Sequence, residues 1–194
     1  MRRYFTTALR MIAVMTVLTG LIYPLLLTGL CQAIFHARTD GSLIRRNGVI
    51  VGSRLIGQAF SEPQYFQSRP SAAGSGAGYD PTDSTGSNLG PTNAQLIRRV
   101  RAAVAAFRRA NPNYRGRIPA DLVTASGSGL DPDLSPDAAL AQVPRVAAAR
   151  HLSEARVRAL VLSHVEGRQW NLFGEPRVNV LELNLALEDA SSGK

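Results

Sequence analysis

The residues that could carry out chemistry are scattered along this chain. Three histidines, His36, His151 and His164, lack the spacing of a metal site. His164 and Glu166 are two residues apart and would not share a helix face. Neither a phosphate-binding loop nor an Asp-Lys-Thr-Gly-Thr phosphorylation sequence occurs. We therefore predict no ATPase activity, no catalytic residue and no metal site of the chain's own.

The segment 124–131, TASGSGLD, comes nearest to a nucleophile turn. Neither Ser126 nor Ser128 has glycine at both flanking second positions, as G-x-S-x-G requires. We interpret the segment as a turn. A membrane-anchored extracytoplasmic hydrolase using one of these serines is kept as the alternative function.

The next residues alternate like the start of a calcium loop. They are Asp131, Asp133, Ser135 and Asp137. Proline occupies the position where such a loop needs glycine, and Gln142 occupies the last acidic position. We interpret these residues as turn and helix-cap chemistry.

One apolar segment precedes all of these residues. Residues 11–34 carry no formal charge, and as a helix they would be ~36 Å long, enough to cross a ~30 Å hydrocarbon core. Pro24 should kink this helix, while Gly20 and Gly29 favour close contact with other helices. The run is too long for an ordinary cleaved signal peptide. We divide the chain into a cytoplasmic N-terminus (1–10), a transmembrane helix (11–35) and an extracytoplasmic soluble domain (36–194).

The soluble domain reads as α+β, one domain of mixed helix and sheet. Asn47-Gly48 between apolar residues predicts a hairpin. Spacing and cap residues predict a loop over 68–93, helices over 93–110, 135–150 and 153–166, and strands over 122–124 and 178–187. We expect Pro144 to interrupt the second helix.

The chain is basic, with a formal net charge of +8, and Lys194 is its only lysine. No nucleic-acid-binding motif accompanies this charge, so we predict no nucleic-acid partner. The arginines of helix 93–110 form a solvated face or contact lipid headgroups or an acidic partner. A basic, membrane-tethered nucleic-acid or lipid-binding module remains a third function.

Seven motifs extend over nearly the whole chain. In order they are IYPLLL, GSRLIGQAF, YFQSRPSA, GSNLGPTN, DLVTASGSGLDPDLSP, QVPRVAAAR and GEPRVNVLELNLAL. In sequence and order they resemble the C subunit family of the Kdp potassium-transporting P-type ATPase.

This resemblance implies a non-catalytic subunit of a high-affinity potassium uptake complex in the bacterial inner membrane. Its partners would be the other Kdp subunits, namely a channel-like potassium-translocating subunit, a P-type ATPase subunit and a very small stabilising subunit, together with membrane lipid. It implies assembly and catalytic-chaperone roles that raise the ATP affinity of the P-type ATPase subunit, where ATP and Mg are bound, with no cofactor of this chain's own. It also implies an outward-facing domain.

A glutamine of the family's soluble domain is proposed to contact ATP, and by position Gln142 is the candidate. Local packing or capping by this residue is the other interpretation. An outward-facing domain could not reach cytoplasmic ATP directly, so we expect any effect on ATP affinity to arrive by coupling through packed membrane helices.

Overall fold

The structure is a computed structural model that describes residues 1–75 and 78–191. Residues 76–77, within the predicted loop, and 192–194 lie outside the described residues. The chain divides into two compact units, Met1–Leu43 and a second that begins at Ile44. Each is described by itself.

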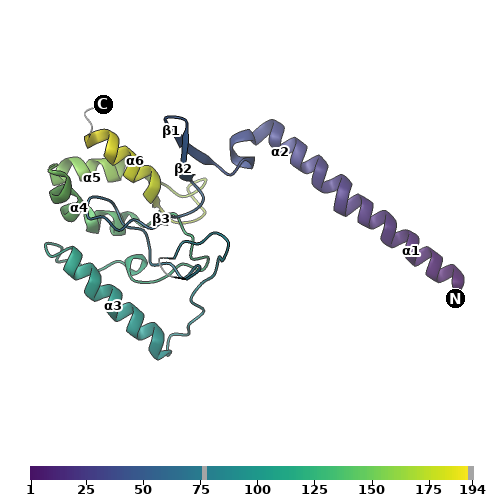
Figure 1. The fold of residues 1–194 in the computed structure, drawn as a ribbon, viewed down its shortest axis with the longest axis horizontal. Helices are drawn as coiled ribbons and strands as arrows, with labels where there is room; N and C mark the ends of the chain where they lie inside the picture. The colour runs from purple at the N-terminus through teal and green to yellow at the C-terminus, as the bar shows by residue number, and fades with distance from the viewer. Residues whose placement is uncertain (76–77, 192–194) are drawn as a thin grey trace. The chain divides into compact units, whose positions relative to one another are not determined.

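The first unit is a helix of 38 residues, Arg2–Thr39, long and apolar enough to cross a membrane, with a mean hydropathy of 2.0 in its most apolar stretch. It consists of α1 (Arg2–Val17), a π-turn η1 (Leu18–Ile22) and α2 (Tyr23–Thr39) (Figure 1). Pro24 stands just after the π-turn. The π-turn widens the helix where the proline ring would otherwise press against the preceding turn. The kink itself lies at Phe35, whose φ and ψ angles of −125° and +41° are not helical, so the position predicted from Pro24 is wrong.

The second unit mixes helices and strands, as predicted. Its strands are β1 (Leu43–Arg46), β2 (Val49–Ser53), β3 (Asp133–Leu134), β4 (Val165–Glu166) and β5 (Arg177–Asn179). Its helices are α3 (Ala94–Ala110), the 3-10 turn η2 (Ala120–Leu122), α4 (Pro136–Arg150), α5 (Glu154–Ser163) and α6 (Val180–Ser191).

The strands form two small antiparallel sheets. β1 and β2 pair across Asn47 and Gly48, whose φ angles of +51° and +80° are those of the predicted tight hairpin. The other sheet has the order β3-β5-β4. β5 pairs with both neighbours and is the central strand.

The core lies where α4, α5 and α6 gather around the three-stranded sheet, whereas α3 lies to one side and reaches the core through Phe107 (Figure 1). Small residues such as Ala138 and Ala141 are buried on α4 and allow close packing. The predicted caps Ser135 and Ser153 are confirmed, since each side chain accepts a hydrogen bond from a first-turn N–H, and Asn93 caps α3 in the same way.

The predicted interruption at Pro144 is wrong. α4 runs through Pro144 to Arg150. Proline costs a helix interior about 3 kcal/mol, and here the burial of both flanking residues, Val143 and Arg145, holds the helix together.

The predicted strand over 178–187 is also wrong beyond Asn179. The chain turns into α6, whose buried residues Val180, Leu183, Asn184 and Leu187 follow helical spacing. The Asn179 side chain stops the strand and starts the helix by accepting a hydrogen bond from Glu182 N–H.

The predicted strand over 122–124 is wrong, because Leu122 ends the 3-10 turn η2 and residues 123–124 form a turn and a bend. The helix predicted to reach residue 166 ends at Ser163, before β4. The helix predicted over 93–110 is confirmed as α3.

Candidate functional site

Gln142 lies on the buried face of α4, with only 1% of its surface exposed. Its amide oxygen accepts hydrogen bonds from Gln67 N–H (2.9 Å) and from the Arg145 guanidinium (2.6 Å). Its amide nitrogen donates to the carbonyl oxygens of Gln67 (3.0 Å) and Ala138 (3.4 Å). Both ends of the amide are therefore in use inside the domain.

Asn184 on α6 makes the same kind of contact with the neighbouring residue. Its side-chain oxygen accepts from Phe66 N–H (2.8 Å), and its nitrogen donates to Phe66 carbonyl oxygen (2.9 Å). The backbone of Phe66 and Gln67 thus pairs with two side-chain amides in the way that a strand would pair with a neighbouring strand.

Arg145, 9% exposed, completes this arrangement. It donates to Asn111 Oδ1 (3.1 Å) and to the backbone carbonyl oxygens of Pro63 and Tyr65, the latter at 3.0 Å. These acceptors are all neutral, and burial lowers the pKa of Arg145 to about 10. We call Gln142, Arg145, Asn184 and Asn111 the amide–arginine network.

The amide–arginine network has one evident structural effect. Residues 63–67 have no helix or strand of their own, and α4 and α6 supply the hydrogen-bond partners of their backbone. Buried backbone groups without partners are costly, so this network fixes the course of the segment. Gln142 therefore has the packing role that we weighed against nucleotide contact, and the nucleotide contact itself stays a prediction.

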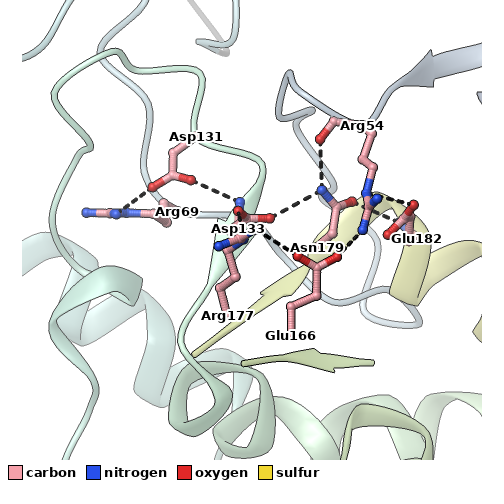
Figure 2. Close-up of polar contacts among 8 residues, drawn as sticks. All are labelled: Arg54, Arg69, Asp131, Asp133, Glu166, Arg177, Asn179 and Glu182. Atoms are coloured by element: carbon pink, nitrogen blue, oxygen red, sulfur yellow. Dashed lines mark hydrogen bonds and ion pairs between the residues drawn. The ribbon is translucent and has the colours of Figure 1, made fainter. Parts of the chain in front are cut away.

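A second set of polar residues, the charge network, joins the three-stranded sheet to its surroundings (Figure 2). It consists of Arg54, Arg69, Asp131, Asp133, Glu166, Arg177, Asn179 and Glu182. Their side chains come from the loop that follows β2, the loop that precedes β3, the strands β3, β4 and β5, and the first turn of α6.

Two arginines link the elements of the charge network. Arg177 pairs with Glu166 (2.8 Å) and Asp133 (3.1 Å), while Arg54 pairs with Glu166 and with Glu182 (3.1 Å) (Figure 2). These side chains are partly exposed, so each pair contributes little alone, and their value lies in joining separate elements.

Asp133 lies at the centre of the charge network. Its carboxylate accepts from Asn179 Nδ2 (3.2 Å), and its backbone N–H donates to Asp131 Oδ1 (3.0 Å). Burial raises the pKa of the Asp133 carboxyl, an effect that the nearby Arg177 partly opposes. Asp131 itself pairs with Arg69 (2.7 Å).

The other residues singled out from the sequence do not join these networks. Ser126 Oγ accepts from Gly129 N–H (2.9 Å) and Ser128 Oγ from Leu130 N–H (3.1 Å), so both hydroxyls stabilise the turn. These bonds join each hydroxyl to the backbone and bring it no histidine or carboxylate, so they give the hydrolase alternative no support. Ser135 caps α4.

The histidines remain apart from one another. His36 lies on α2, His151 ends α4 with a φ of +55°, and the His164 ring contacts the carbonyl oxygen of Leu160. Glu166, which the sequence placed near His164, forms its ion pairs with Arg54 and Arg177. Among residues 1–75 and 78–191, His, Cys, Asp and Glu form no group able to hold a metal ion.

Sequence reasoning missed most of these contacts. Gln67 and Gln142 are 75 residues apart, and Phe66 and Asn184 are 118 apart, so local patterns cannot reveal them. One signal existed. On a helix spanning residues 180–187, Asn184 is the polar residue on the buried face, and a buried polar side chain needs a partner.

A family model described as "K+-transporting ATPase, c chain" matches residues 5–189. Proteins named "Potassium-transporting ATPase KdpC subunit" are similar along nearly their whole length. The one from Dechloromonas aromatica is 51% identical over 191 residues, which cover 98% of this chain and 100% of the relative. Those from Methylorubrum populi and Gemmatimonas aurantiaca are 53% and 54% identical, with 97% and 99% of this chain covered, and 98% and 96% of theirs.

Proposed function

Since this chain belongs to the KdpC family, the c chain of K+-transporting ATPases, we propose that it is a non-catalytic accessory subunit of an ATP-driven potassium uptake complex. One observation carries the proposal. The match runs through both the apolar helix and the domain, from residue 5 to residue 189, so it is not confined to a shared anchor.

Within this proposal the partners are a channel-like potassium-translocating subunit, a P-type ATPase subunit that binds ATP and Mg, and a very small subunit. The chain stabilises their assembly and raises the ATP affinity of the catalytic subunit. Gln142 and Arg145 form hydrogen bonds that hold residues 63–67 in place. These two polar side chains therefore have a structural part in the domain, which fits a non-catalytic subunit.

The orientation belongs to the same proposal. Residues 1–10 lie inside a bacterial inner membrane and the domain lies outside, as the resemblance implies. From outside, the domain influences the ATP site indirectly. The coupling passes through packed membrane helices whose arrangement depends both on contact with the domain and on ATP binding. Direct contact of Gln142 with ATP would require an inward-facing domain and the opening of its bonds to Gln67.

The helix offers surfaces for such packing. A side-chain carbon at Gly29 would meet no atom within 4 Å, and one at Gly20 would meet only Thr16, at 3.9 Å. Both positions therefore leave the helix backbone open to the close approach of another helix.

The test is to purify the pump with and without this chain at matched levels of the other subunits, and to measure potassium-stimulated ATP hydrolysis across ATP concentrations. We expect omission to abolish assembly or to raise the ATP concentration required. An intact, fully active complex without this chain would refute the proposal.

A variant of the helix separates assembly from folding of the domain. Gly29→Leu should reduce co-purification of the partner subunits, and Ala13→Leu, which places a leucine elsewhere on the helix, serves as the matched control. Equal co-purification of the two variants would exclude Gly29 from the contact.

A further inference from the structure

A tight turn between β4 and β5 displays apolar side chains to solvent. Gln169 N–H donates to Phe173 carbonyl oxygen (2.9 Å), and Phe173 N–H donates back to Gln169 carbonyl oxygen (3.0 Å). We call residues 169–173 the aromatic turn. At its tip Trp170 and Asn171 have φ angles of +52° and +57°.

The backbone of the aromatic turn holds its tryptophan in an unfavourable conformation. Asparagine visits the left-handed region readily, but a bulky residue there is an outlier that the surroundings must hold in place. Such positions mark sites where the exact presentation of a side chain matters. The residue held there is the chain's only tryptophan.

The side chains of the aromatic turn are exposed and packed against one another. Trp170 is 87% exposed, Leu172 66% and Phe173 56%. The Trp170 and Phe173 rings meet edge to face with centroids 6.0 Å apart. At the base, Arg168 donates to both carboxylate oxygens of Glu175 at 2.7 Å. The apolar tip is therefore formed before any partner arrives.

The strands beneath the aromatic turn contact the part of the domain that follows the membrane helix. Arg54, the residue after β2, pairs with Glu166 of β4, and its carbonyl oxygen accepts from Asn179 of β5 at 2.9 Å (Figure 2). β2 pairs with β1, and only residues 40–42 separate β1 from the helix end at Thr39. Three residues reach at most ~10 Å, so the tether between the helix and the domain is short.

We propose that the aromatic turn inserts Trp170, Leu172 and Phe173 into the headgroup region of the bilayer leaflet that faces the domain. The proposal rests on the helix spanning a membrane and does not require the pump subunits. Its effect is to give the domain a second attachment point and thereby a fixed orientation on the membrane.

Three arguments favour lipid over a protein partner. Tryptophan prefers the membrane–water interface, where its amphipathic ring is partly hydrated. A stable protein interface buries about 800 Å² on each partner, more than three side chains on one turn supply. Shallow insertion beside an existing anchor needs no such area, and residues 36–194 hold 19 basic against 14 acidic side chains, an excess that suits an anionic surface.

The single tryptophan makes a direct test possible. The full chain is reconstituted in nanodiscs of phosphatidylcholine and phosphatidylglycerol, with or without bromine atoms on the acyl chains, which quench a nearby indole. We expect brominated lipid to quench Trp170 and the bilayer to shield it from aqueous iodide.

Variants test whether the neighbouring apolar side chains hold Trp170 in the lipid. The double variant Leu172→Ser/Phe173→Ser should lower the partition coefficient of the aromatic turn from water into the bilayer on the order of tenfold. Quenching of Trp170 by brominated lipid should fall with it. Leu162→Ser, at an apolar residue of α5 that is 54% exposed, should leave quenching unchanged.

Two results would overturn the proposal. One is a Trp170 that iodide reaches freely and brominated lipid does not quench, in the unaltered chain. The other is a Trp170 that becomes shielded only when the other pump subunits are present, still without quenching by lipid, because a protein would then cover the turn. Either result leaves the proposed role in the pump standing, since omission of the chain tests that role separately.

Discussion

Gln142→Ala should destabilise the domain by removing the hydrogen bonds that hold Gln67. Three groups lose their partner: the Gln67 N–H, the Gln67 carbonyl oxygen and one Arg145 nitrogen. A buried polar group without a partner costs about 1–3 kcal/mol. Gln67 is half-buried and water can reach it in part, so we expect a loss of about 3 kcal/mol in the free energy of unfolding.

Two measurements on the full chain in detergent test this loss. Urea unfolding should give a lower midpoint for Gln142→Ala, and amide hydrogen exchange at Gln67 should speed up by about a hundredfold, which corresponds to about 3 kcal/mol. Gln95→Ala, at an exposed glutamine of α3, is the matched control and should change stability by less than about 0.5 kcal/mol. Unchanged unfolding and a still protected Gln67 amide would show that the amide–arginine network does not hold this segment.

Three further substitutions test local features, each by urea unfolding. Gly129→Ala should cost about 2–4 kcal/mol because Gly129 has a φ of +70° and its Cβ would lie 2.5 Å from a backbone carbonyl oxygen, whereas Gly127→Ala, with no atom within 4 Å, should cost far less. Pro144→Ala should stabilise the protein by about 1–2 kcal/mol by restoring a helical N–H, and a loss of stability would refute this account of α4. Burial outweighs the attraction of Arg177 and raises the pKa of Asp133, so the folded state binds this proton more tightly than the unfolded chain does. This carboxyl therefore lowers the free energy of unfolding as pH rises above its usual pKa of 3.8, and Asp133→Asn should reduce that fall in titrations at a series of pH values.

The sequence was sufficient where neighbouring residues alone decide the structure. Asn47 and Gly48 tolerate positive φ, so they specify the hairpin without help from the rest of the chain. Ser135 and Ser153 cap the helices that follow them for the same local reason. The resemblance identified the family because it used motifs from the whole chain.

Local patterns failed where the chain offers two alternatives. Residues 178–187 alternate well enough for a strand, yet the same residues also fit a helix with one apolar face. Asn179 marks the boundary between the two structures, because it pairs with β3 through its backbone and caps α6 with its side chain. Beyond Asn179 the folded core selects the helix, since Leu183 and Leu187 are fully buried there.

The two amides of the amide–arginine network can separate the two explanations of the proposed chaperone role. Asn184 holds Phe66 as Gln142 holds Gln67, but the family's nucleotide proposal concerns only the glutamine. Suppose that ATP affinity depends on this domain through coupling. Gln142→Ala and Asn184→Ala should then both raise the ATP concentration that the assembled pump needs, and the variant that destabilises the domain more should raise it more. Direct contact predicts instead that Gln142→Ala weakens ATP binding while an equally destabilised Asn184→Ala does not, and that outcome would place the domain on the ATP side of the membrane.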